Sequence, residues 1–129
     1  MNYFEILSLP MQFDISLEQL ENQLIVQSNQ HNQTLLNTAY NTLKDDYERG
    51  KYIAKLQFPH INMQSIKLDK SFLQEILEYK INHNQIKIQN KYNSIYQEAN
   101  LYFTKKNAQN FCHSITKLLF LKKLLQHNI

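Results

Sequence analysis

This sequence predicts an all-α fold, and two observations support the prediction. The 129 residues include one glycine and two prolines. That is too few for the many tight turns of a β-sandwich or β-barrel, whereas long helices need almost none. Apolar residues also recur at spacings of three and four through most of the chain, which is the helical period. A chain of this length forms one ordinary domain or two very small ones.

The first part of the chain is expected to form a small helical unit over residues 1–56. A short apolar turn should end before Pro10, because proline moves the preceding residue out of helical geometry. Ser16 begins an S-x-x-Q capping box, which predicts the start of a longer helix. A further helical period follows the polar stretch SNQHNQT at 28–34, and Asp45 begins another capping pattern.

The second part is expected to form a three-helix bundle over residues 69–129. Residues 57–68 lose the helical period and contain Pro59, so this segment predicts a connector between the two parts. Three further stretches of helical period follow the connector, and three helices of this length typically pack as an antiparallel bundle.

The sequence contains no pattern typical of an enzyme. It has no Gly-rich phosphate loop, no G-x-S-x-G and no H-E-x-x-H, and its carboxylates form no convincing inward-facing pair. The five histidines lie in different segments. Cys112 and His113 are adjacent, but neighbours on a helix point about 100° apart and do not easily share a metal shell. We therefore expect no catalytic activity, no metal site and no cofactor.

Charge and hydropathy leave little reason to expect a membrane or nucleic acid as partner. The net charge is only +3, and the longest apolar run is too short to cross a bilayer. MNYFEILSLP lacks a leader pattern and Cys112 is the only cysteine, so we expect a cytoplasmic protein. The tyrosines and lysines of residues 90–107 could stack bases, but Tyr92 and Tyr102 share the helical period of a core.

The stretch FLQEILEYK at 72–80 has two apolar strips on one predicted helix. Phe72 and Ile76 can face the bundle, while Leu73 and Leu77 form a second strip one step round the helix. The second strip either packs inside the protein or docks another protein as an exposed patch. The helical period alone favours packing inside the protein.

Four segments in this order make the chain resemble the HscB family, the J-domain co-chaperones of iron–sulfur cluster assembly. They are NYFEILSLP at 2–10, AYNTLKDDYERGKYIAKL at 39–56, FLQEILEYK at 72–80 and KLLFLKKL at 117–124. The resemblance covers most of the chain and rests on the order and spacing of the segments. It implies a J-domain-like unit followed by a three-helix bundle.

In that family the elbow after the second helix carries His-Pro-Asp, through which a J-domain stimulates the ATPase of a DnaK- or HscA-type chaperone. The matching residues in this chain are His31, Asn32 and Gln33. The proline and the aspartate are absent, and the basic patch that the family has on its second helix is replaced by glutamines. The resemblance therefore implies a shortened, degenerate J-domain with weak or lost stimulation of the chaperone.

The resemblance also implies that the C-terminal bundle binds an IscU-like scaffold protein. The matching positions are Leu73, Gln74, Leu77, Glu78, Lys80 and Phe120. Gln74 stands where the family has an apolar residue. The expected function is a co-chaperone-like adaptor that binds the cluster scaffold. The alternatives are a decayed helical interaction module without a chaperone role, and a small basic bundle that binds nucleic acid.

Overall fold

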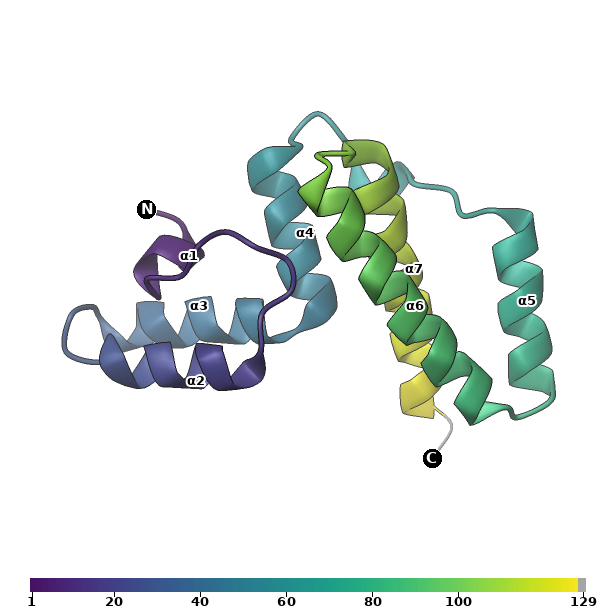
Figure 1. Ribbon diagram of the computed structural model, residues 1–129, viewed down its shortest axis with the longest axis horizontal. Helices are drawn as coiled ribbons and strands as arrows, with labels where there is room; N and C mark the ends of the chain where they lie inside the picture. The colour runs from purple at the N-terminus through teal and green to yellow at the C-terminus, as the bar shows by residue number, and fades with distance from the viewer. Residues whose placement is uncertain (128–129) are drawn as a thin grey trace. The chain divides into compact units, whose positions relative to one another are not determined.

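The computed structural model describes residues 1–127, and its elements of regular structure are all helices (Figure 1). In order they are α1 (Tyr3–Ile6), α2 (Leu17–Val26), α3 (Gln33–Lys44), α4 (Asp46–Gln57), the short 3-10 helix η1 (Met63–Ser65), α5 (Lys70–Ile81), α6 (Gln85–Thr104) and α7 (Ala108–His127). This confirms the all-α prediction. Within residues 1–127, no helix has both the length and the apolar character that crossing a membrane requires.

The chain divides into two compact units, Met1–Gln57 and Phe58–Ile129. In the first unit α3 contacts α1, α2 and α4, and α2 lies antiparallel beside it (Figure 1). The side chains of the core include Phe4, Ile6, Leu7, Phe13, Leu20, Leu36, Ala39, Leu43 and Ile53. Ser16 caps α2, because its Oγ accepts a hydrogen bond from the backbone N–H of Gln19 at 3.1 Å. Ser16 is therefore the N-cap that the sequence predicts.

α4 holds the N-terminal segment in place through two side chains. Arg49 is buried, and its guanidinium donates hydrogen bonds to the backbone carbonyls of Phe13 and Leu43. One turn later, the hydroxyl of Tyr52 accepts a hydrogen bond from the backbone N–H of Tyr3 at 2.9 Å. The rings of Tyr3 and Tyr52 are stacked, with centroids 4.6 Å apart. These contacts link the first two segments that carry the resemblance.

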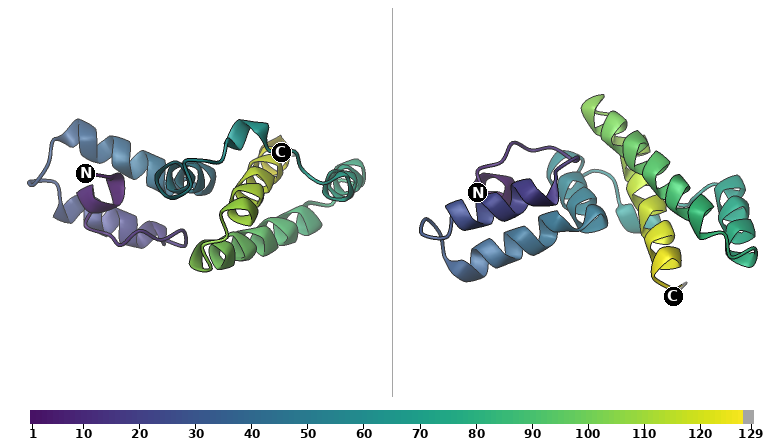
Figure 2. Two further views of the ribbon diagram at one scale, coloured as in Figure 1. Left: turned by 90° about the horizontal axis from the view of Figure 1, so that it is seen from above. Right: turned by 60° about the horizontal axis from the view of Figure 1, so that its bottom comes forward.

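The second unit is built on α6 and α7, which run antiparallel and side by side (Figures 1 and 2). α5 packs along α6. The side chains of this core are Phe72, Ile76, Ile88, Ile95, Ala99, Phe111, Cys112, Ile115, Leu118 and Leu121. Tyr92 and Tyr102 are half-buried beside Ile95 and Ala99 on α6. Their face of the helix is therefore largely used in packing.

The expected connector was residues 57–68, but Gln57 ends α4 in the first unit and residues 58–68 fall within the second unit. Phe58 is buried, and its ring meets the ring of Phe111 edge-on with centroids 5.9 Å apart. Proline follows at position 59, and η1 makes a single turn before α5 begins. The segment lacks a helical period because it forms no α-helix. It is held by the buried ring of Phe58 and by the short turn of η1.

Two helices of the second unit end in left-handed residues other than glycine. His83 follows α5 with φ 51°, and Lys106 follows α6 with φ 57°. After each, the next N–H reaches back to a carbonyl five residues earlier, from Asn84 to Tyr79 at 3.0 Å and from Asn107 to Tyr102 at 2.9 Å. This is the Schellman arrangement, in which glycine is the usual residue. The chain can therefore turn sharply although its single glycine lies elsewhere.

Candidate protein-binding surface

α5 buries one side and exposes an apolar strip on the other. Phe72 and Ile76 are buried, whereas the exposed fractions of Leu73 and Leu77 are 41% and 55%. The helical period alone favoured burial of both leucines, but Phe72 and Ile76 already fill the side of α5 that faces the core. The two leucines are therefore free to contact another protein.

Ile81 extends this strip by one more turn. It is exposed and follows Leu77 by four residues, as Leu77 follows Leu73, so the three side chains lie along one face of α5. Gln74, Glu78 and Lys80 are also exposed and lie beside the strip. The i+4 spacing of Ile81 is visible in the sequence, although the strip predicted from the sequence ended at Leu77.

Phe120 lies on α7 and is 45% exposed. Three residues before it, the ammonium of Lys117 lies 5.1 Å from the centroid of the Phe72 ring on α5. This contact joins α7 to α5 one residue before Leu73. Phe120 therefore comes three residues after this contact on α7, and Leu73 comes one residue after it on α5.

A polar cluster fixes the rotation of α5 on the bundle. The hydroxyl of Tyr79 donates to Glu75 Oε2 at 2.6 Å, and Lys91 Nζ on α6 lies 3.0 Å from Glu75 Oε1. The hydrogen bond from Tyr79, followed by Lys91 and Lys117, holds the pKa of the Glu75 carboxyl below its usual value against the effect of burial. The cluster keeps the strip on the outer side of α5.

The elbow between α2 and α3 carries the altered tripeptide, and two of its residues serve the start of α3. The Asn32 side-chain oxygen accepts hydrogen bonds from the backbone N–H groups of Thr34 at 2.8 Å and Leu35 at 3.3 Å. The Gln33 side chain donates to Asn37 Oδ1 at 3.0 Å. His31 is half-buried in the bend. Asn32 is therefore an N-cap, a role that the sequence analysis missed because asparagine is so frequent in this chain.

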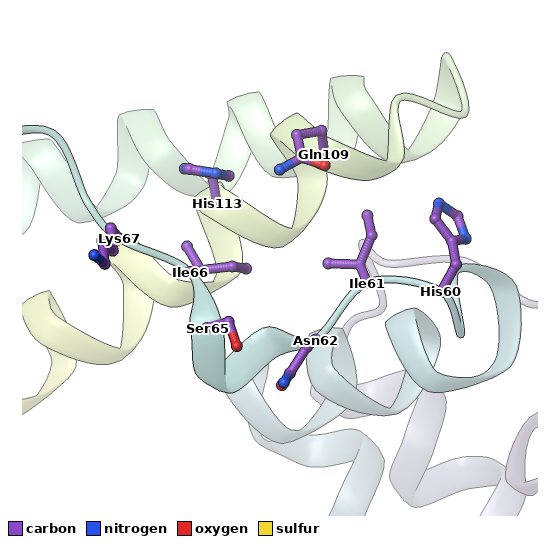
Figure 3. A pocket seen from close by; sticks show the side chains of 8 residues that line it. All are labelled: His60, Ile61, Asn62, Ser65, Ile66, Lys67, Gln109 and His113. Atoms are coloured by element: carbon purple, nitrogen blue, oxygen red, sulfur yellow. The ribbon is translucent and has the colours of Figure 1, made fainter.

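A hollow of about 510 Å³ lies in the second unit between the segment around η1 and the start of α7 (Figure 3). Its lining includes His60, Lys67, Gln109 and His113. His60 and His113 stand on different segments and do not point at one another (Figure 3). Among residues 1–127 no group of three His, Cys, Asp or Glu side chains is placed to hold a metal ion. The hollow shows no convergent set of catalytic groups.

No protein-family model matches the chain. Solved structures that share its fold include two HscB co-chaperones. Chaperone HscB from Vibrio cholerae is 22% identical with a TM-score of 0.79, and the match covers 99% of this chain and 95% of that one. Human co-chaperone protein HscB is 19% identical with a TM-score of 0.84, over 99% of this chain and 80% of that one. The chain therefore has the HscB fold over nearly its whole length, as the four segments implied.

Proposed function

We propose that this chain is a co-chaperone-like adaptor of iron–sulfur cluster assembly, and that it works in the cytoplasm. Its second unit binds an IscU-like scaffold protein through Leu73, Leu77 and Phe120, while Glu78 and Lys80 orient the contact. The first unit is a degenerate J-domain-like unit. The observation that carries the proposal is the exposed apolar strip of α5, which occurs on a fold shared with HscB co-chaperones.

The chemistry of the strip suits a small protein interface. Exposed leucines beside an aromatic side chain form the usual apolar centre of an interface, and charged side chains at its rim select the orientation of the partner. Gln74 interrupts this surface with an amide, which would be costly to bury without a hydrogen-bond partner. We therefore expect binding weaker than that of a strip with an apolar residue at position 74.

The first unit offers little to a DnaK-type chaperone. The Asn32 oxygen is engaged in capping α3, and α2 has no lysine or arginine. A partner groove that is acidic is approached fastest by a basic surface, and α2 cannot supply one. The adaptor therefore stimulates the ATPase of such a chaperone weakly or not at all.

Calorimetric titration of the full chain with an IscU-like scaffold tests the proposal. Leu73→Ala and Leu77→Ala should each weaken binding by about 1 to 3 kcal/mol, the usual range for interface anchors. Leu101→Ala is the control, because Leu101 is similarly exposed but lies on α6 away from the strip. The control should bind like the native chain.

Thermal melts of the same variants separate binding from folding. If the leucines are interface residues, the melting temperatures of Leu73→Ala and Leu77→Ala should stay close to that of the native chain. A loss of roughly 2 to 5 kcal/mol of stability would instead identify them as core. Absence of binding by the native chain would favour the alternative, a helical interaction module without a role in cluster assembly.

A further inference from the structure

The outer face of α2 carries exposed apolar side chains among acidic ones, although the helix already buries its opposite side. Leu20 is buried in the first unit and Leu24 is half-buried. The exposed residues on the other side form two neighbouring rows with i, i+4, i+8 spacing, Leu17–Glu21–Ile25 and Glu18–Asn22–Val26. A helix that only had to complete the core would not need the exposed apolar side chains of Leu17, Ile25 and Val26.

The apolar side chains of this face gather toward the elbow. The exposed fractions of Ile25 and Val26, in the last turn of α2, are 71% and 62%. Leu35, in the first turn of α3, is also exposed. Because α2 and α3 run antiparallel, the end of α2 and the start of α3 lie at the same end of the pair (Figure 1). The α2 face is defined here as Leu17, Glu18, Glu21, Ile25, Val26 and Leu35.

The charged side chains of the α2 face itself, Glu18 and Glu21, are both acidic. No lysine or arginine precedes Lys44 in the chain, whereas Glu5, Asp14, Glu18 and Glu21 do. Lys44 is the last residue of α3, so it lies away from the elbow, at the end of the helix pair where α2 begins. Residues 1–57 hold seven acidic and four basic side chains, whereas residues 58–129 hold four acidic and ten basic ones. The net charge is thus negative in the unit that carries the α2 face and positive in the other unit.

We propose that the α2 face docks a protein partner whose contact surface is apolar and rimmed by lysines or arginines. Burial of Ile25, Val26 and Leu35 supplies the attraction, and Glu18 and Glu21 select the sign of the partner. An anionic lipid surface is disfavoured because the same carboxylates repel it. A symmetric pair of copies is disfavoured because it would oppose two acidic faces. This contact is separate from scaffold binding, which uses α5 and α7.

The probe is a synthetic amphipathic helical peptide of leucines and lysines, titrated into the isotope-labelled full chain and followed by backbone amide NMR shifts. A peptide with glutamates in place of the lysines is its charge-reversed partner. We expect saturable shifts in residues 17–35 with the lysine peptide only, weakening as salt screens the carboxylates. Shifts elsewhere, or equal shifts with the glutamate peptide, would overturn the proposal.

Four variants sharpen this experiment. Glu21→Lys and Ile25→Gln should each raise the dissociation constant for the lysine peptide about tenfold, by charge reversal and by loss of apolar contact. Glu48→Lys, on exposed α4 surface, and Ile86→Gln, on exposed α6 surface, are the matched controls and should leave it within about twofold. Controls that weaken binding equally would contradict a specific face.

Two further measurements test whether a second copy of the chain or a lipid surface, rather than a basic protein partner, binds the α2 face. Concentration-dependent shifts of the α2 face without peptide would point to a second copy of this chain and overturn the proposal. Binding of the native chain to vesicles of anionic lipid through the same residues would also overturn it. Failure of the scaffold titration leaves this proposal unaffected, because the two experiments report on different helices.

Discussion

Arg49 donates a hydrogen bond from Nε to the backbone carbonyl of Phe13, 36 positions earlier in the chain. The same guanidinium lies 5.0 Å from the centroid of the Phe13 ring, donates to the carbonyl of Leu43 at 2.7 Å and forms an ion pair with Asp46 at 3.0 Å. A buried arginine is tolerated only when its charge is paired and its donors are used. Arg49 therefore joins α4 to the loop before α2 and to the end of α3.

Replacing Arg49 with methionine should lower the stability of the first unit by about 2 to 5 kcal/mol, because two carbonyls lose a buried donor. Urea unfolding followed by circular dichroism measures the loss. Lys55→Met on the same helix is the control, since Lys55 is exposed and should change stability by about 0.5 kcal/mol or less. Equal effects of the two substitutions would contradict a special role for Arg49.

Replacing Lys106 with glycine should stabilise the second unit by about 0.5 to 1 kcal/mol, because glycine adopts the left-handed backbone without a steric penalty. Lys105→Gly is a matched control. Lys105 is the C-cap of α6 with φ −82°, so glycine there should give no gain and a small loss. Thermal melts of the two variants should shift in opposite directions. A destabilised Lys106→Gly protein would show that the lysine side chain matters more than the backbone.

Local signals in the sequence predicted most helices but few of the contacts between them. The capping oxygen of Ser16 and the separate apolar strip of Leu73 and Leu77 follow from residues within one or two turns, but the exposure of that strip does not, because the helical period alone favoured its burial. The burial of Arg49 depends on Phe13, which no local pattern connects to it. Phe58 is similar, because its partner Phe111 is far along the chain. Such pairs are fixed by tertiary packing and cannot be read from periodicity.

The stability of the second unit should fall in acid partly through Glu75. Its pKa lies below the usual value of 4.5, chiefly because Tyr79 donates a hydrogen bond to the carboxylate. A depressed pKa means that the folded state favours the charged form, so this stabilisation is present above about pH 4.5 and is lost as pH falls through the folded-state pKa.

Glu75→Gln should therefore lower the urea midpoint at pH 7, and the difference from the native chain should shrink as pH falls below 4.5. Glu78→Gln is the control on the same helix, because Glu78 is exposed. Glu78→Gln should leave the urea midpoint nearly unchanged at pH 7 and below pH 4.5. A difference between native and Glu75→Gln proteins that stays constant with pH would show that ionisation of Glu75 is not the cause.

The Cys112 thiol should be unreactive in the folded protein. It is buried, and burial raises its pKa to about 11. Because the thiolate is the reactive form, alkylation by iodoacetamide at pH 8 should be roughly a hundredfold slower in the native chain than in concentrated urea. The raised pKa also predicts stability that is complete below about pH 9 and declines toward pH 11. The control is Thr104→Cys in a Cys112→Ala chain, because position 104 is exposed and its thiol should react readily in the folded protein.

Restoring His-Pro-Asp at the elbow should not restore stimulation of a DnaK-type ATPase. Asn32 has φ −59°, which proline can adopt, so Asn32→Pro with Gln33→Asp should still fold. Loss of the Asn32 capping oxygen should cost about 1 kcal/mol, partly offset by aspartate in the first turn of α3.

The acidic sign of the α2 face is unchanged by these two substitutions, so encounter with an acidic groove stays slow. Steady-state ATPase rates of the chaperone should thus be equal with the native chain and with the double variant. Adding Glu18→Lys and Glu21→Lys to the double variant then tests the charge directly, because any gain that appears only in this fourfold variant assigns the defect to α2. Saturable stimulation by the native chain would refute the proposed loss of chaperone contact. If the double variant stimulates the ATPase and the native chain does not, the whole defect lies in the tripeptide.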